Sequence, residues 1–364
     1  MRIRLFARTA VILLSPLCAA LAASVDNLVV FGDSLSDNGN AAAALASQGQ
    51  TLGNYAPNAL TDGPNTNPPT SGPFGLWVDQ FAAKFGLPDP TPFIANTSGG
   101  LAVNPFGTNF AVGSAQTGHN PAFALSGLLN QPPVVPWTTD QVDIFNSLNQ
   151  STAAPGSLYS FWAGSDDISH ALSSNPLTVV SVAQNAANNI ESNIKTLAGE
   201  GGKYFLWFNL PPLGDTPAAR SAGPLAMLAA NQATAAFNAQ MSADVTDLEH
   251  MLSNVVIITI DIHSAFEQIE GNPQAFGFAN ITDSAQGKNV DPNTYLFWDD
   301  LHPTTAADAL IADLAAGEAS RFVTATPEPA SVALAFLGII VLAAFGWGRS
   351  LSSRRCLVRP RSNE

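Results

Sequence analysis

Three polar residues from the two ends of the central part of the chain have the types needed for nucleophilic chemistry. Ser34 follows the apolar run "NLVVF", whereas Asp299 and His302 stand three residues apart in "FWDDLHPT". A serine hydroxyl is a weak nucleophile until a base removes its proton. An imidazole can be that base, and a nearby carboxylate can accept its Nδ1–H and fix its tautomer. These residues predict a serine nucleophile if the fold brings Ser34 and His302 together; otherwise Ser34 is a turn residue.

The elements that must position these residues follow a regular alternation. Five apolar runs predict strands at Asn27–Phe31, Gly107–Val112, Ser157–Gly164, Lys203–Leu210 and Asn254–Ile262. The last three runs are nearly continuous in apolar residues, which is typical of strands buried on both faces of a parallel sheet. Longer helical patterns lie between and after them, at Phe74–Gly86, Thr138–Gln150, Leu177–Gly201, Ala218–Ser253 and Thr304–Arg321. This order predicts one α/β domain with helices on both faces of the sheet.

Two long loops interrupt the pattern. Ser47–Ser71 and Asn120–Trp137 are rich in proline, and the first is also rich in asparagine, glycine and threonine. Ligands of open α/β sheets bind at the carboxyl ends of the strands. We therefore expect both loops to form walls of a substrate site rather than linkers between domains.

The two ends of the chain have the composition of export signals. Residues 1–23 combine a basic start, an apolar run and small residues, the layout of a secretory signal peptide. Near the other end, Ala330–Trp347 carries no charge over 18 residues and is followed by five arginines. This length is just sufficient for a transmembrane helix with an arginine-rich cytoplasmic flank. We expect the part between these segments, residues 24–325, to be exported.

Charge and cysteine content narrow the possible functions. Residues 24–325 carry six lysines and arginines against 26 aspartates and glutamates, a formal charge of −20. Such a charge repels nucleic acid and anionic lipid headgroups, so we expect no nucleic-acid partner. The two cysteines, Cys18 and Cys356, lie outside this part, which therefore contains no disulfide. No histidine pair has zinc-like spacing, so we expect neither a metal site nor a cofactor.

Five sequence blocks, in order, resemble the GDSL lipase/esterase family, also called SGNH hydrolases. They are "FGDSLSDNGN", "GTNFAVGSAQTG", "FWAGSDDI", "FNLPPLGDTP" and "WDDLHPT". The resemblance implies a flavodoxin-like three-layer αβα sandwich with a mostly parallel five-stranded sheet, formed by residues 24–323 as one hydrolase domain. Because Ser34 is not in a G-x-S-x-G elbow, the α/β-hydrolase fold is disfavoured.

The resemblance also implies roles for single residues. Ser34 would be the nucleophile, His302 the general base and then acid, and Asp299 the carboxylate that orients it. The oxyanion hole would use the backbone N–H of Ser34, a backbone N–H at Gly113 or Ser114, and the side chain of Asp166. The sequence departs from the family here, because Ser114 replaces a usual glycine and Asp166 replaces an asparagine. An ionised carboxylate cannot donate a hydrogen bond, so Asp166 either is protonated or weakens the hole.

Residues 324–364 resemble a PEP-CTERM sorting tail, because "PEP", the apolar span 330–347 and the arginines follow in that order. This implies a cell-surface or extracellular protein, held briefly in the inner membrane and then processed by an exosortase-type enzyme. A plain membrane anchor is the alternative. The sequence thus predicts a secreted serine esterase or lipase, acting on short-chain, lipid or acylated-sugar esters. The alternative function is a weakly active or non-catalytic surface or matrix-binding protein on the same fold.

Overall fold

A single four-stranded parallel sheet forms the centre of the molecule. We analysed a computed structural model, which describes residues 23–62, 75–129 and 134–325. The strands run in the order β2 (Asn27–Gly32), β5 (Ser157–Trp162), β6 (Tyr204–Phe208) and β7 (Val256–Ile260). Almost every residue of β2, β5 and β6 is buried, as expected for strands that are covered on both faces.

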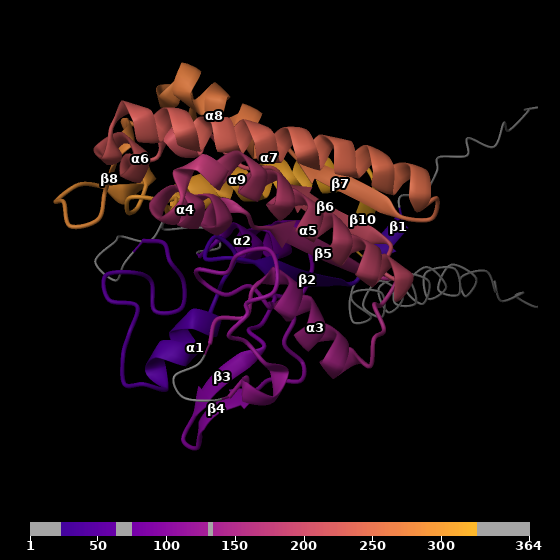
Figure 1. Cartoon of the computed structure of the whole chain (residues 1–364). Coiled ribbons are helices and arrows are strands. Elements are labelled where there is room, and N and C mark those ends of the chain that lie inside the picture. Colours follow the sequence, from indigo (N-terminus) through magenta and orange to yellow (C-terminus); the bar gives the residue numbers. More distant parts are fainter. Residues whose placement is uncertain (1–22, 63–74, 130–133, 326–364) are drawn as a thin grey trace, which may run out of the picture.

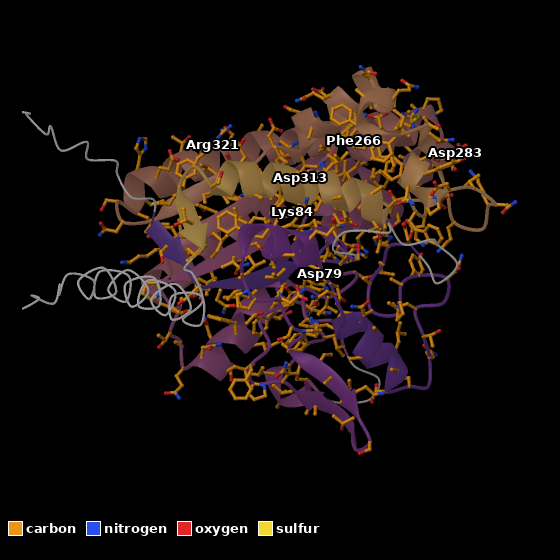
Figure 2. All side chains as sticks on the ribbon, turned by 180° about the vertical axis from the view of Figure 1, so that it is seen from behind. Asp79, Lys84, Phe266, Asp283, Asp313 and Arg321 are labelled. Atoms are coloured by element: carbon orange, nitrogen blue, oxygen red, sulfur yellow. The ribbon has the colours of Figure 1, made fainter. Side chains whose placement is uncertain are left out.

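Helices cover both faces of this sheet. The longer ones are α2 (Trp77–Phe85), α3 (Thr138–Asn149), α5 (Val179–Gly199), α7 (Pro224–Met251) and α9 (Thr305–Ala319). Figure 1 shows α3, α5 and α7 in front of the sheet, and the reverse view in Figure 2 shows α9 in front. α2 packs on α9, and α5 packs on both α3 and α7. The fold is therefore a three-layer αβα sandwich, and the predicted α/β class is confirmed.

The predicted five-stranded sheet has four regular strands and one irregular segment. Residues 107–112 lie beside β2 through a single parallel bridge between Val30 and Asn109. Val30 N donates to Thr108 O at 2.8 Å, and Phe110 N donates to Val30 O at 2.8 Å. The Asn109 side chain accepts from Ala111 N at 3.0 Å, which turns the backbone out of a regular ladder. This segment holds the edge position, so the spatial order is the flavodoxin-like 2-1-3-4-5.

One predicted helix is divided in two. The pattern over Ala218–Ser253 forms α6 (Pro217–Ala222) and then α7, which are separated by Gly223. Gly223 has φ of 97°, a left-handed value that ends α6, and Pro224 starts α7 without needing a backbone donor. The prediction of one continuous helix was therefore wrong at this point.

Several shorter elements were not predicted. The short helices among them are α1 (Asn40–Ala46), α4 (Ser165–Ser174) and α8 (Ile262–Gly271). The strands form the pairs β1 (Ala23–Val25) with β10 (Val323–Ala325), β3 (Ile94–Thr97) with β4 (Gly100–Val103), and β8 (Asn280–Ser284) with β9 (Tyr295–Phe297). The 3₁₀ turns are Leu125–Gly127, Pro176–Thr178, Leu213–Asp215, Pro273–Phe276 and Pro292–Thr294.

The predicted terminal signals fall almost entirely outside the described residues. Residues 1–22 and 326–364 are not described, so the signal peptide, the sorting tail and the apolar span 330–347 stay predictions. In the described part of the chain, no helix combines the length and apolar character that crossing a bilayer requires. Parallel pairing of β1 with β10 brings residues 23–25 beside residues 323–325.

Candidate active site

Ser34 lies just beyond the carboxyl end of β2, at the edge of the sheet. Its side chain is 6 % exposed. The backbone reaches this position through Gly32, where φ is 156° and a Cβ would collide with the carbonyl oxygen of Trp162 on β5. Only glycine allows this close approach of two strands. The first sequence block thus places a serine at the edge where ligands of such sheets bind.

A turn between β9 and α9 carries His302. Trp298 N donates to His302 O at 2.8 Å and closes the turn. The Thr304 hydroxyl donates to Tyr295 O at 2.7 Å and accepts from Ala307 N at 3.3 Å, so it caps α9 and ties it to β9. His302 is therefore held between a strand and the N-terminus of a helix; the helix was predicted from the sequence and the strand was not.

The structure brings the three predicted catalytic side chains together. His302 Nε2 lies 2.8 Å from Ser34 Oγ, and His302 Nδ1 lies 2.6 Å from Asp299 Oδ2. Residues 34 and 302 are 268 positions apart in the chain. The side chains of Asp299 and His302 are each 12 % exposed. The distances match those of a nucleophile, base and orienting carboxylate.

The environment of Asp299 fixes the proton arrangement of His302. Burial favours the neutral acid, but the hydrogen bonds and charge of His302 outweigh it and lower the pKa of Asp299 to about 2. Asp299 Oδ1 accepts from the backbone N–H of Leu301 at 2.7 Å and of His302 at 2.6 Å. An ionised carboxylate can only accept, so Nδ1 carries the proton and Nε2 presents its lone pair to Ser34.

Tyr55 completes the surroundings of Asp299 and was not predicted. Its hydroxyl donates to Asp299 Oδ2 at 2.8 Å, and its ring meets the His302 ring edge-on at a centroid distance of 6.3 Å. Burial and the hydrogen bond to Asp299 raise the pKa of Tyr55 to about 12, so the hydroxyl remains a donor. Tyr55 lies in an irregular loop 244 residues before Asp299, and nothing in the local sequence indicates this contact.

The loop that contains Tyr55 braces the His302 turn. Asn54 O accepts from Trp298 Nε1 and from Gln286 Nε2, each at 3.1 Å. The Thr61 hydroxyl donates to Pro303 O at 3.1 Å. We predicted Ser47–Ser71 and Asn120–Trp137 as walls of a substrate site. Their described parts do not line the cavity beside Ser34, but Leu52, Leu60, Leu128 and Pro136 line a second pocket that includes Gly113 and Ser114.

The second sequence block lies beside Ser34. A methyl group placed on Gly113 would lie 3.8 Å from Ser34 Cβ. The N–H of Gly113, however, donates to Asp37 Oδ2 at 2.9 Å, so it is not free to bind an oxyanion. In the described part of the chain, the N–H groups of Ser34 and Ser114 have no acceptor. Of the two predicted positions, Ser114 is therefore the one with an available donor.

Ser114 keeps the backbone conformation that glycine would adopt. Its φ is 67°, in the left-handed region, where a non-glycine residue costs about 1–2 kcal/mol. The side chain is exposed, and the fold tolerates the strain. The replacement of the family's usual glycine therefore leaves the donor in place.

Asp166 lies in the first turn of α4 and lines the same cavity as Ser34 and Asp33. Burial raises the pKa of Asp166 to about 6, although the charge of His302 acts in the opposite direction. Burial and the charge of Asp166 also raise the pKa of Asp33 well above its usual value. Asp33 Oδ2 is buried and has no partner among the described residues. The two acids therefore oppose each other's ionisation, and both favour the protonated form.

A buried polar network holds the first two blocks together. Asn40 Nδ2 donates to Asn109 O and Ala111 O, each at 2.9 Å. Asp37 accepts from the backbone N–H groups of residues 39, 40 and 41 at the start of α1. These side chains fix the loop after Ser34 against residues 107–113. Asp37 therefore stabilises the turn that precedes α1 and links it to Gly113.

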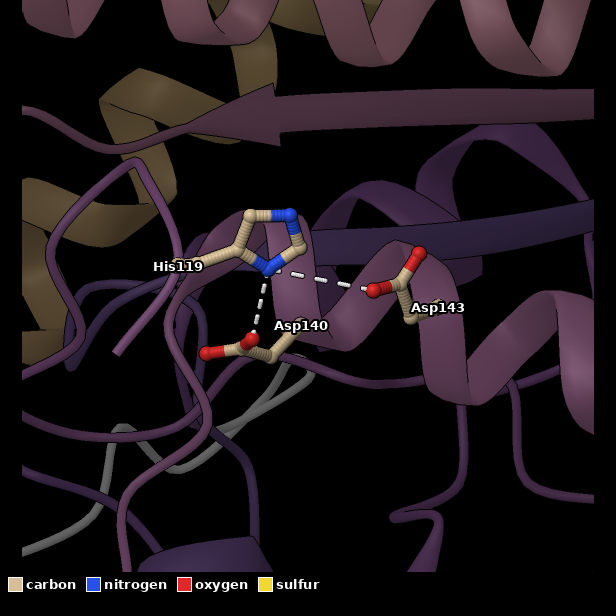
Figure 3. A group of neighbouring side chains, drawn as sticks. All are labelled: His119, Asp140 and Asp143. Atoms are coloured by element: carbon tan, nitrogen blue, oxygen red, sulfur yellow. Dashed lines mark hydrogen bonds and ion pairs between the residues drawn. The ribbon is translucent and has the colours of Figure 1, made fainter. Parts of the chain in front are cut away.

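His119 belongs to a separate cluster. Figure 3 shows its ring next to Asp140 and Asp143 on α3, with Nδ1 at 2.8 Å from Asp140 Oδ1 and 3.8 Å from Asp143 Oδ2. The three groups offer atoms within 4.8 Å of one another. Asp140 Oδ2 already accepts the N–H groups of Asn120 and Trp137, which explains its position as a cap of α3. His119 does not line the cavity beside Ser34.

Most of the chain matches a known protein family. Residues 28–315 match the family model described as GDSL-like Lipase/Acylhydrolase. The chain belongs to the GDSL lipase/acylhydrolase family. The matched region contains Ser34, Asp299 and His302, and it runs from the second residue of β2 into α9.

Similar proteins include GDSL esterases of a plant. A GDSL esterase/lipase of Arabidopsis thaliana is 25 % identical over 330 residues, which cover 82 % of this chain and 93 % of the relative. An inactive GDSL esterase/lipase-like protein of the same plant is 27 % identical over 318 residues, covering 79 % and 70 %. Among solved structures, an acetylxylan esterase of Geobacillus stearothermophilus is 10 % identical with a TM-score of 0.41, covering 82 % of this chain and 95 % of that one.

Proposed function

We propose that this GDSL family member is an exported carboxylic ester hydrolase that works through an acyl intermediate on Ser34. The observation that carries the proposal is the continuous pair of hydrogen bonds from Ser34 Oγ to His302 Nε2 and from His302 Nδ1 to Asp299. Family membership supplies the reaction class, and the apolar cavity at Ser34 supplies space for a substrate.

Acylation begins at Ser34. His302 Nε2 removes the hydroxyl proton while Oγ attacks the ester carbonyl carbon, and a tetrahedral intermediate with a negative oxygen forms. Asp299 stabilises the imidazolium by accepting its Nδ1–H. His302 then returns the proton to the alcohol oxygen as the carbon–oxygen bond breaks, so the alcohol leaves and the acyl group remains on Ser34.

Deacylation repeats these steps with water. His302 Nε2 removes a proton from water, the hydroxide attacks the acyl carbon, and the proton is transferred to Ser34 Oγ as the carboxylic acid leaves. The same nitrogen serves both halves because Asp299 and Tyr55 hold the ring in one orientation. No cofactor is needed for either half of the cycle, because each bond change is a proton transfer, an addition to the carbonyl carbon or the departure of an oxygen leaving group.

Three donors are proposed for the oxyanion. The N–H groups of Ser34 and Ser114 supply two of them, and the protonated carboxyl of Asp166 supplies the third. The pKa of about 6 for Asp166, which burial raises, supports the third assignment. An acid kept neutral by its surroundings can donate where the family's amide would.

One observation favours the alternative of a weakly active or non-catalytic surface protein. Above its pKa of about 6, Asp166 is ionised and would repel the developing oxyanion. One curated relative is itself named as inactive. The catalytic proposal takes precedence because the Ser34–His302–Asp299 geometry is complete.

Hydrolysis assays separate these two functions. The purified protein is expected to hydrolyse p-nitrophenyl esters at pH 6, and Ser34→Ala and His302→Ala are each expected to lower kcat by at least about 10³-fold. His250→Ala is a matched control because His250 is exposed on α7 and does not line the cavity beside Ser34. Turnover that survives Ser34→Ala would rule out the acyl-serine route.

Export and tail processing are further parts of the proposal. The basic and apolar start of residues 1–23 and the Pro-Glu-Pro, apolar and arginine order of residues 324–364 support it. We propose that the signal peptide is removed and that an exosortase-type enzyme cleaves the tail. Intact-mass measurement of the mature protein checks both sites; a full-length C-terminus in the membrane fraction would instead indicate a permanent anchor.

A further inference from the structure

A large apolar cavity opens beside Ser34. It has a volume of about 480 Å³. Its polar members near the nucleophile are Asp33, Ser165 and Asp166, and most of the remaining lining is aliphatic or aromatic. An acetyl group would leave nearly all of this space unfilled, since a 150 Å³ apolar cavity already holds a benzene ring.

Two helices form the walls of the cavity with matching apolar stripes. The stripe of α8 consists of Ile262, Ala265, Phe266 and Ile269, and the stripe of α9 consists of Ala307, Leu310, Ile311 and Leu314. Both follow the i, i+3, i+4, i+7 spacing of one helix face. Leu296 and Phe297 of β9 also line the cavity, and they pack in one apolar cluster with Phe266 and Ile269 of α8 and Ala307 of α9. We call the part of the cavity that the two stripes line the channel.

We propose that this channel binds the linear acyl chain of the substrate, and that the protein is selective for esters of medium-chain fatty acids of about 8–12 carbons. The inference rests on the proposed ester hydrolase function and names its substrate class. It excludes acetylated sugars as the preferred substrates, because an acetyl group makes no use of the channel.

The chain in the channel is the acyl part rather than the alcohol part. The leaving alcohol must take its proton from His302 Nε2, so it departs on the side of the imidazole. Ser34 and Asp166 line the channel, and Leu301 and Pro303 on either side of His302 also line it. The imidazole is not part of the lining formed by the described residues. The group that stays bonded to Ser34 therefore has direct access to the channel.

The length of the channel sets the expected chain length. The α9 stripe runs from Ala307 to Leu314, which spans about 10 Å at 1.5 Å per residue. An extended chain advances about 1.2 Å per bond, so this distance corresponds to about eight or nine bonds. At the outer edge the lining includes the exposed residues Gln268, Phe276 and Asp313, where a longer chain would reach solvent.

A chain-length series tests the proposal. For p-nitrophenyl esters, kcat/KM is expected to rise about 3–4-fold per methylene from acetyl to about decanoyl, and then to level off or fall. Reversed esters test which part enters the channel, so methyl decanoate is expected to be hydrolysed at least 10-fold faster than decyl acetate. Equal rates on acetyl and decanoyl esters, or a preference for decyl acetate, would overturn the inference and leave the hydrolase function intact.

A variant that fills the channel with a larger side chain tests the same inference. Ala265→Phe introduces a ring from α8 and is expected to lower decanoyl ester turnover at least 10-fold while acetyl ester turnover stays within about 2-fold. Ala275→Phe makes the same change at an exposed position outside the lining and is expected to leave the whole series unchanged. Equal loss on both esters in Ala265→Phe would contradict a channel role.

Binding measurements distinguish a failure of this inference from a failure of the proposed hydrolase function. Calorimetry with Ser34→Ala, which keeps the channel, is expected to detect methyl octanoate but not methyl acetate, and the added Ala265→Phe change is expected to remove the signal. If no ester is hydrolysed by the unmodified protein, the hydrolase function fails. Methyl octanoate binding would then still support the channel, whereas no binding would overturn the inference as well.

Discussion

At the scale of single residues, the role proposed for Asp166 in the oxyanion hole depends on pH. Burial raises its pKa to about 6, so it is protonated below that pH and ionised above it. A protonated carboxyl can donate to the oxyanion, and an ionised one opposes it. The kcat of the protein is therefore expected to fall as pH rises through about 6.

Asp166→Asn tests this assignment, because an amide donates at every pH. The ratio of variant to unmodified kcat is expected to be near 1 at pH 5.5 and to rise about 10–100-fold by pH 8. A ratio that exceeds 1 equally at every pH would mean that Asp166 only weakens the hole. No change at any pH would remove Asp166 from the oxyanion hole altogether.

Tyr55 is a positioning residue that acts through Asp299. Tyr55→Phe removes the hydrogen bond to Asp299 Oδ2 and is expected to lower kcat roughly 10-fold with little change in KM, because the bond to a charged group orients the carboxylate. Tyr295→Phe is the matched control, since its hydroxyl has no partner among the described residues. Equal kcat in Tyr55→Phe and the unmodified protein would show that Asp299 needs no such support.

At the scale of elements, α3 holds the end of the strand that carries Ser34. Gln141 on α3 is buried, its Nε2 donates to Gly32 O at 2.8 Å, and its Oε1 accepts from Gly32 N at 2.9 Å. Among the described residues, no other side chain both donates a hydrogen bond to and accepts one from the backbone of a single β2 residue. The position of Ser34 therefore depends on a helix more than a hundred residues later.

Gln141→Leu is expected to lower the free energy of unfolding by about 2–4 kcal/mol, because both backbone groups of Gly32 lose a buried partner. Chemical denaturation measures the loss. Gln274→Leu, at an exposed position, is the control and should change stability by less than about 0.5 kcal/mol. A loss in Gln141→Leu no larger than in the control would show that the two bonds do not stabilise β2.

Sequence alone predicted the elements with strong local patterns and missed those defined by distant contacts. The runs that became β2, β5, β6 and β7 were clear, because burial on both faces leaves an apolar signature. Residues 107–112 form an irregular edge because Asn109 bonds its own neighbour, which no periodicity reveals. The Tyr55 contact and the occupied N–H of Gly113 depend on packing between separate loops, so sequence patterns could not show either.

At the scale of the whole molecule, buried acids make stability depend on pH. Burial raises the pKa of Asp62 and Asp79 to about 6 and that of Asp167 to about 7. Residues 24–325 contain only six lysines and arginines to compensate such charges. Between pH 4 and 7 the native state therefore binds more protons than the unfolded chain, and its stability falls as pH rises.

The expected result is a melting temperature that decreases by roughly 5 °C or more from pH 4.5 to pH 8, measured by calorimetry at constant ionic strength. Below pH 4 the melting temperature is instead expected to decrease as pH falls. The pKa of Asp299 is lowered to about 2 in the native state, so protonation of Asp299 removes the stability that its ionised form contributes. Asp62→Asn is expected to reduce the decrease of the melting temperature with pH above pH 4. Asp247→Asn, at an exposed position, is expected to leave that decrease unchanged. A melting temperature that rises from pH 4.5 to 8 would contradict this account.

The central claim is that His302 and Asp299 activate Ser34, and reaction with a fluorophosphonate probe tests it most directly. The probe forms a covalent bond only with an activated serine oxygen, and peptide mass spectrometry locates the adduct. We predict stoichiometric labelling of Ser34 in the native protein, and a loss of labelling in His302→Ala. A folded protein that stays unlabelled, or that is labelled equally in His302→Ala, would contradict the account.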